Sequence, residues 1–118
     1  MTPEEVLRAF GERLAARDAN GAAALFAEDA TYDEPPVHFE GRAAIEGFIT
    51  EFDASHYDAR FMVHRALTSP DEALAAAEWR WSYTRDADDE ARVFEGASFI
   101  TFREGLIASW RGFSARMR

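Results

Sequence analysis

Tyr32 and Glu34 are the two residues whose types and spacing are best suited to chemistry. They fall at the end of a short strand predicted over residues 30–33, just before Pro35-Pro36. Because side chains alternate along a strand, both point to the same face. A carboxylate among apolar walls is harder to ionise, which raises its pKa toward the range of a general base. We therefore take Glu34 as a candidate base and Tyr32 as a hydrogen-bond donor; solvent exposure or ion pairing of Glu34, and wall packing of Tyr32, are the alternatives.

Aromatic residues alternate along a second strand, predicted over residues 72–85. Trp79, Trp81 and Tyr83 share one face of it, and Trp110 follows in the last strand of the chain. Such a row forms either a wall for a planar or polycyclic ligand or an ordinary core. The two interpretations coincide if the aromatic residues surround a cavity.

Three helices must position these strands. Thr2, Pro3 and Glu5 predict a capped start for a helix from about residue 3 to residue 19, and a short helix follows over residues 22–27. A third helix begins after Gly41 and has one apolar face, with residues at i, i+3, i+4 and i+7: Ile45, Phe48, Ile49 and Phe52.

Four strands are predicted in the second half, over residues 55–67, 72–85, 91–103 and 106–114. In the first of them one half-buried face is expected to hold Tyr57, Ala59, Phe61, Val63 and Leu67. Helices followed by strands joined through hairpins predict an α+β fold, with the helices on one side of an antiparallel sheet. The length of 118 residues fits a single domain over residues 1–118.

Large apolar residues occur on both faces of the last two strands, including Phe99 and Phe113. In a sheet with one face exposed to solvent, apolar and polar residues would alternate regularly along each strand. We therefore expect helices on one face and a partner subunit on the other, which predicts a homodimer through the outer sheet face. A strongly curled sheet is the alternative.

Composition narrows the function classes. The formal charge of −9 disfavours nucleic acid and anionic membrane surfaces as partners. The chain has no cysteine, which excludes thiolate chemistry and fits the cytoplasm. No apolar run approaches the roughly 20 residues that span a bilayer. His38, His56 and His64 lack metal-ligand spacing, so we expect no metal and no cofactor.

Three segments resemble the SnoaL-like branch of the nuclear transport factor 2-like superfamily: residues 24–31 (ALFAEDAT), 39–45 (FEGRAAI) and 105–111 (GLIASWR). The resemblance implies a cone, in which a curved sheet wraps three helices around a deep apolar cavity. It also implies a hydrophobic small molecule as ligand. It does not imply one reaction, because the superfamily includes ketosteroid isomerases, epoxide hydrolases, polyketide cyclases, dehydratases and non-catalytic binding modules.

Transfer of the family's catalytic positions succeeds only in part. Glu34 matches the carboxylate base of the steroid isomerases, whereas Phe10 and Ser98 stand where their oxyanion donors are found. Gly112 and Ser82 replace the two aspartates of the epoxide hydrolases. This pattern predicts an isomerase-, cyclase- or dehydratase-type enzyme that acts on a hydrophobic carbonyl compound, or else a non-catalytic ligand-binding or protein-interaction module. The expected catalytic residues are Glu34, Tyr32 and Ser98, and the expected substrate-binding residues are Phe10, Phe26, His38, Phe48, Trp79, Trp81 and Trp110.

Overall fold

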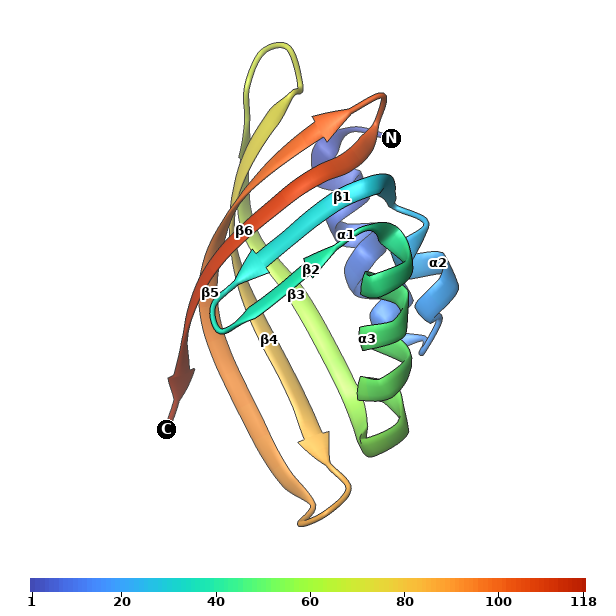
Figure 1. Cartoon of the computed structure of the whole chain (residues 1–118). Helices are drawn as coiled ribbons and strands as arrows, with labels where there is room; N and C mark the ends of the chain where they lie inside the picture. Colours follow the sequence, from blue (N-terminus) through green and yellow to red (C-terminus); the bar gives the residue numbers. More distant parts are fainter.

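A computed structural model describes residues 1–118, with three helices and six strands. The elements are α1 (Pro3–Ala15), α2 (Ala19–Ala23), β1 (Phe26–Glu34), β2 (Val37–Glu40), α3 (Arg42–Ser55), β3 (His56–Thr68), β4 (Leu74–Arg85), β5 (Glu90–Arg103) and β6 (Leu106–Met117). One curved sheet, in the order β2-β1-β6-β5-β4-β3, faces the helices (Figure 1). The predicted α+β class, with helices on one side of the sheet, is confirmed.

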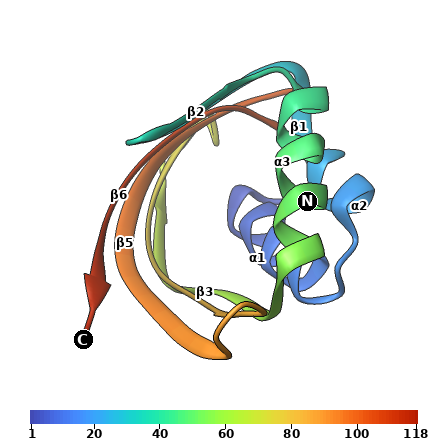
Figure 2. The same ribbon diagram turned by 60° about the horizontal axis from the view of Figure 1, so that its bottom comes forward.

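The sheet is mixed, whereas the hairpin pattern predicted an antiparallel one. β1 pairs with β2 in antiparallel fashion and with β6 in parallel fashion. A parallel pair needs a long connection between its strands, and here β2, α3 and the β3–β5 meander supply it. Figure 2 shows the sheet curling around the helices without closing on itself.

Helix boundaries differ from the predicted ones by a few residues. The capping box is present, because the Thr2 hydroxyl accepts from the Glu5 backbone N–H while the Thr2 backbone N–H donates to Glu5 Oε1. α1 ends at Ala15, before Arg17, which adopts a left-handed φ of 59°. Asp18 then caps α2 by accepting from the backbone N–H of Gly21, so this helix begins three residues earlier than predicted and β1 begins at Phe26.

β3 does not keep the regular alternation that its sequence suggests. Its pairing with β4 shifts register between Tyr57 and Arg60 and again between Val63 and Arg65. Asp58, within the first shift, has a φ of 53°. A one-residue slip moves side chains to the opposite face. Tyr57 and Leu67, predicted to share the half-buried face, are therefore 36% and 67% exposed.

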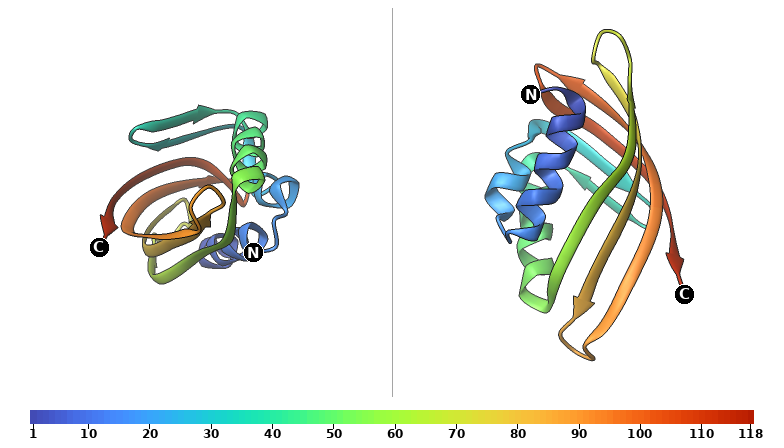
Figure 3. Two further views of the ribbon diagram at one scale, coloured as in Figure 1. Left: turned by 90° about the horizontal axis from the view of Figure 1, so that it is seen from below. Right: turned by 180° about the vertical axis from the view of Figure 1, so that it is seen from behind.

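The core lies between α1 and the concave face of the sheet. Phe10 of α1 packs its ring against Phe26, Phe61 and Trp110 at centroid distances of 5.5, 5.6 and 5.7 Å. Both views of Figure 3 show the helices along the open side of the curved sheet. None of the helices has the length and apolar character that crossing a membrane requires.

Candidate functional site

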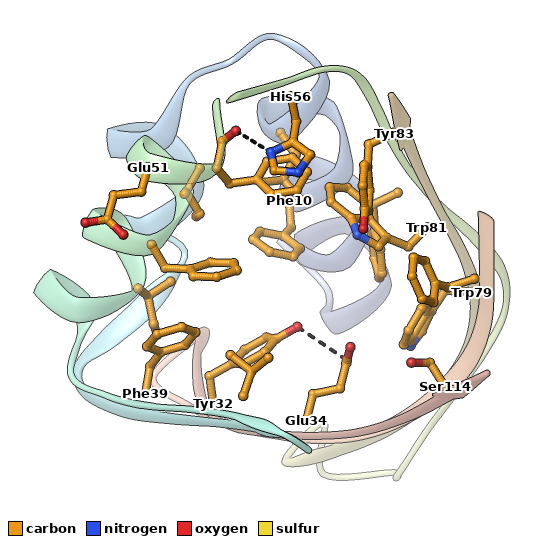
Figure 4. Close-up of a pocket in the computed structure, with 18 of the residues that line it drawn as sticks. Phe10, Tyr32, Glu34, Phe39, Glu51, His56, Trp79, Trp81, Tyr83 and Ser114 are labelled. Carbon is orange, nitrogen blue, oxygen red and sulfur yellow. Dashed lines mark hydrogen bonds between the residues drawn. The ribbon is translucent and has the colours of Figure 1, made fainter. Parts of the chain in front are cut away.

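A cavity of about 640 Å³ lies between the helices and the concave face of the sheet. Figure 4 shows side chains from α1, α3 and the strands pointing into it. Ten of the 22 residues that line it are phenylalanine, tyrosine or tryptophan: Phe10, Tyr32, Phe39, Phe48, Phe52, Phe61, Trp79, Trp81, Tyr83 and Phe94. An apolar cavity with a few polar groups is the usual form of a small-molecule site.

Glu34 and Tyr32 meet at one wall of this cavity (Figure 4). The Tyr32 hydroxyl donates to Glu34 Oε1 at 3.3 Å, and the Tyr32 ring stacks on Trp110 at a centroid distance of 5.5 Å. Burial raises the pKa of Glu34, and the Trp110 indole and the Tyr32 hydroxyl offset this only in part. Burial, reinforced by Glu34, also raises the pKa of Tyr32 well above its ordinary value. Tyr32 therefore acts as a neutral donor, and Glu34 Oε2 is the oxygen left to accept a proton.

Gly112 makes room for the Glu34 carboxylate. A Cβ atom on this glycine would stand 2.4 Å from Glu34 Oε1 and 2.9 Å from Ser98 Oγ, closer than real contacts allow. The carboxylate at position 34 thus occupies the space into which a side chain at position 112 would project. The two positions cannot both carry a carboxylate in this geometry.

Ser98 supports the aromatic wall. Its side chain is 1% exposed and does not line the cavity, and its Oγ accepts from Trp79 Nε1 at 2.8 Å. The bond orients the Trp79 indole, which does line the cavity. Trp110 Nε1, by contrast, is buried and makes no hydrogen bond of normal geometry, although the indole lies near enough to Glu34 to lower the pKa of its carboxyl.

His56 lines the opposite wall, where the register shift of β3 places it (Figure 4). Its ring stacks on Phe52 at 4.0 Å and meets the edge of Tyr83 at 5.0 Å. Nδ1 lies 2.9 Å from the carbonyl oxygen of Phe52. Ser55 Oγ, which can donate or accept, lies 3.0 Å from the same nitrogen. Because the Phe52 carbonyl can only accept, this contact requires the hydrogen on Nδ1, with Ser55 Oγ as a second acceptor; Nε2 of the neutral ring is then left as an acceptor. The alternation pattern assigned this face to Tyr57, so sequence reasoning missed His56.

The other predicted site residues divide into two groups. Phe10, Phe48, Trp79 and Trp81 line the cavity together with Tyr32 and Glu34. Three others do not line it: Phe26 and Trp110 pack behind it in the core, and His38 lies outside it.

His38 is displaced from the cavity because β2, a strand that the sequence did not predict, pairs it with Asp33. Its imidazole lies 3.8 Å from Asp33 and 3.4 Å from Glu40 and is about half exposed. No three His, Asp or Glu side chains gather as a metal ion would require.

Solved structures share this architecture. A protein of ketosteroid isomerase-like fold from Catenulispora acidiphila, in complex with trimethylamine, is 20% identical, with a TM-score of 0.82 over 95% of this chain and 85% of that one. A putative polyketide cyclase from Pseudomonas putida is 24% identical, with a TM-score of 0.81 over 95% and 90%. An LEH-like epoxide hydrolase from M. tuberculosis is 16% identical, with a TM-score of 0.82 over 97% and 84%. At these identities the likeness shows the fold alone.

Residues 7–110 match the model of the SnoaL-like domain family, and the chain belongs to that family. The resemblance in the three sequence segments is thereby confirmed. No curated protein sequence matches the chain. Because this fold carries many reactions, function has to be inferred from the site itself.

Proposed function

We propose that this protein binds a hydrophobic carbonyl compound in its cavity and that Glu34 removes a proton from the carbon next to the carbonyl. The observation that carries the proposal is the Glu34 carboxylate itself. It lines an aromatic cavity and is held through Oε1 by the Tyr32 hydroxyl at 3.3 Å.

Burial of Glu34 serves this chemistry. A carboxylate whose pKa is raised binds a proton more tightly and is the stronger base when ionised. Oε2 would accept the proton while Tyr32 keeps the group oriented. The proton is then available for return to another carbon, which is an isomerisation, or for a departing hydroxyl, which is a dehydration. Ser98 enters this proposal as a positioning residue, through its bond to Trp79.

The aromatic wall and His56 define where the rest of the ligand lies. Trp79, Trp81 and Tyr83 form a surface suited to a planar ring system. On the opposite wall, Nε2 of His56 is placed to accept a hydrogen bond from a ligand hydroxyl.

Exchange of the α-hydrogens of 1-tetralone for deuterium, followed by NMR in D₂O, tests the base directly. The protein should accelerate the exchange, and Glu34→Gln should lower the rate by about 100-fold or more, the usual contribution of a general base. Binding of the ketone, read from Trp79 and Trp81 fluorescence, should stay within about threefold.

Glu51→Gln is the matched control, because Glu51 also lines the cavity but comes from α3 and, in Figure 4, points away from Tyr32 and Glu34. It should leave exchange unchanged. An equal loss in both variants, or no acceleration by the wild-type protein, would exclude Glu34 as a base.

A non-catalytic binding module is the second candidate, favoured by one observation. The Tyr32 hydroxyl is already engaged with Glu34, Ser98 does not line the cavity, and Phe10 offers no donor for a developing oxyanion. In that case the fluorescence titration would saturate while the ketone showed no exchange above the solvent rate.

We further propose that a second copy of the chain covers the outer sheet face. Phe99 and Phe113 lie on that face and are 56% and 50% exposed, and Arg111 lies over the Phe113 ring at 5.4 Å. Burial of such side chains between subunits is favourable. Sedimentation should give a dimer for the wild-type protein and a monomer for Phe113→Glu, which still binds the ketone.

A further inference from the structure

One end of the cavity carries arginine side chains that the proposed base chemistry does not use. Arg116, near the end of β6, lines the cavity. Arg85 and Arg92 belong to the β4–β5 hairpin, and each is paired in the sheet with a residue that lines the cavity. Because directly paired residues point to the same face, all three arginines belong to the concave face. Figure 1 shows the β4–β5 hairpin and the C-terminal end of β6 at the same end of the molecule.

The three arginines outnumber the carboxylates that form ion pairs with them. Arg85 lies 2.6 Å from Asp88, Arg92 lies 3.7 Å from Asp88 and 3.5 Å from Glu90, and Arg116 lies 2.8 Å from Glu90. Two carboxylates thus contact three guanidinium groups, while Asp86 and Asp89 of the same hairpin tip make no ion pair with them. Nε of Arg85 is buried without a hydrogen-bond partner, and Nη1 of Arg92 is buried with only the 3.5 Å ion-pair contact to Glu90.

The inward positions of β6 connect this group to Glu34. Gly112, Ser114 and Arg116 follow one another along the concave face, with Glu34 Oε1 beside Gly112 and with Ser114 and Arg116 lining the cavity. Four residues of extended strand span about 13 Å. A ligand whose reacting carbon lies at Glu34 would therefore reach Arg116 if it were two or three rings long.

We propose that Arg116, backed by Arg92, binds an anionic group, such as a carboxylate, at the far end of the substrate. The substrate class is then a hydrophobic carbonyl compound that bears an acid group, and only its reacting end rests on the proposed function. Guanidinium groups bind carboxylates through two parallel hydrogen bonds. Glu90 contacts Arg116 through Nη2 alone, so other donors of the guanidinium group are free for a ligand.

Two probes that differ in one charge test the site: biphenyl-4-carboxylate and biphenyl-4-carboxamide, each titrated against tryptophan fluorescence. The wild-type protein should bind the carboxylate at least tenfold more tightly. Arg116→Gln should weaken carboxylate binding about tenfold or more, as loss of a hydrogen bond to a charged group does, and change carboxamide binding less than about twofold. The carboxylate preference should also shrink in high salt.

Arg80→Gln is the matched control. Arg80 is 49% exposed and paired with Glu95, much as Arg116 is 50% exposed and paired with Glu90. Arg80 alternates with Trp79 and Trp81 along β4 and so lies on the outer face, and its substitution should leave both probes unchanged. Equal affinity of the wild-type protein for both probes, or failure of both to bind, would overturn the anion site, as would an equal loss of both in Arg116→Gln.

The exchange assay separates this inference from the proposed reaction. 1-Tetralone has no acid group, so its exchange depends on Glu34 and not on Arg116. If exchange fails while the carboxylate preference holds, the base is wrong and the anion site stands. If exchange succeeds and the two biphenyl probes bind alike, the anion site is wrong and the base stands.

Discussion

β3 and β4 lie side by side along nearly their whole length but present their side chains differently. β4 pairs with β5 without a break, so Ala77, Trp79 and Trp81 follow one another on the concave face. β3 contains two register shifts, and its inward side chains do not keep a period of two. One strand therefore supplies a continuous wall, and the other changes face twice.

The difference between the two strands bears on where the sheet places the cavity residues Glu34 and His56. The unbroken β4–β5 pair supplies aromatic walls and ends in Arg85 and Arg92, whereas Glu34 and His56, on opposite walls of the cavity, lie beyond register shifts. His56 precedes the first shift of β3, and Glu34 follows the shift between Phe26 and Thr31 in the β1–β6 pair. Register shifts re-aim side chains, and they are common beside active sites.

The largest effect is expected on the regular strand. Trp79 is 2% exposed, and its indole fits against Gly96, where a Cβ would stand 2.5 Å away. Trp79→Ala should lower the free energy of unfolding by about 3–5 kcal/mol, because it opens a cavity in the core. Urea unfolding measures the loss. The outward neighbour Arg80, replaced by alanine, should change stability by about 0.5 kcal/mol or less. Comparable losses in the two variants would contradict the assigned faces.

An intermediate effect is expected at the first register shift. Asp58 has a φ of 53°, a conformation that aspartate tolerates and β-branched residues do not. Asp58→Val should cost about 1–3 kcal/mol of stability. Asp58→Gly should fold at least as well as the wild-type protein and keep His56 in the cavity. NMR contacts between the His56 ring and the bound ketone show whether His56 still faces the cavity. Equal stability of Asp58→Val and Asp58→Gly would show that the register shift does not depend on the φ angle of Asp58.

The smallest effect is a pH dependence at Glu34. Its folded-state pKa is raised above the ordinary value of 4.5, so the folded protein favours the protonated carboxyl. The stability that this group contributes is fully present below the unfolded pKa and is lost as pH rises through the folded one. Glu34→Gln should therefore melt close to the wild-type protein near about pH 4 and a few degrees above it near pH 7. Thermal melts across this range measure the difference, and a gap that is constant or widens toward acid would contradict the raised pKa.

Most elements of the fold follow from local patterns in the sequence. The capping box of Thr2 and Glu5 and the apolar spacing in α3 depend on residues within one or two turns, and both are present in the structure. The alternation of Trp79 and Trp81 holds because nothing interrupts the β4–β5 register. Tyr32 and Glu34 share a face for the same local reason, and both line the cavity.

Other features depend on how the strands pair. The parallel β1–β6 pair joins segments from opposite ends of the chain, and no local pattern in the sequence predicts this pairing. β2 follows directly after Pro35-Pro36 and was not predicted, and its pairing with β1 places His38 opposite Asp33 and outside the cavity. The alternation pattern assigned Tyr57 to the face that His56 occupies. This assignment was wrong because the backbone at Asp58 reverses the alternation.

The sequence by itself determined the α+β class, the helices, the aromatic strand and the pair Tyr32 and Glu34, since all of these depend on neighbours close in the chain. Only the tertiary structure decided that His56 faces the cavity and that Gly112 leaves space for Glu34. It also decided that Arg116 lies at the end of the cavity away from Glu34. These last features depend on the register of paired strands. A one-residue shift in register moves a side chain from one face of the sheet to the other.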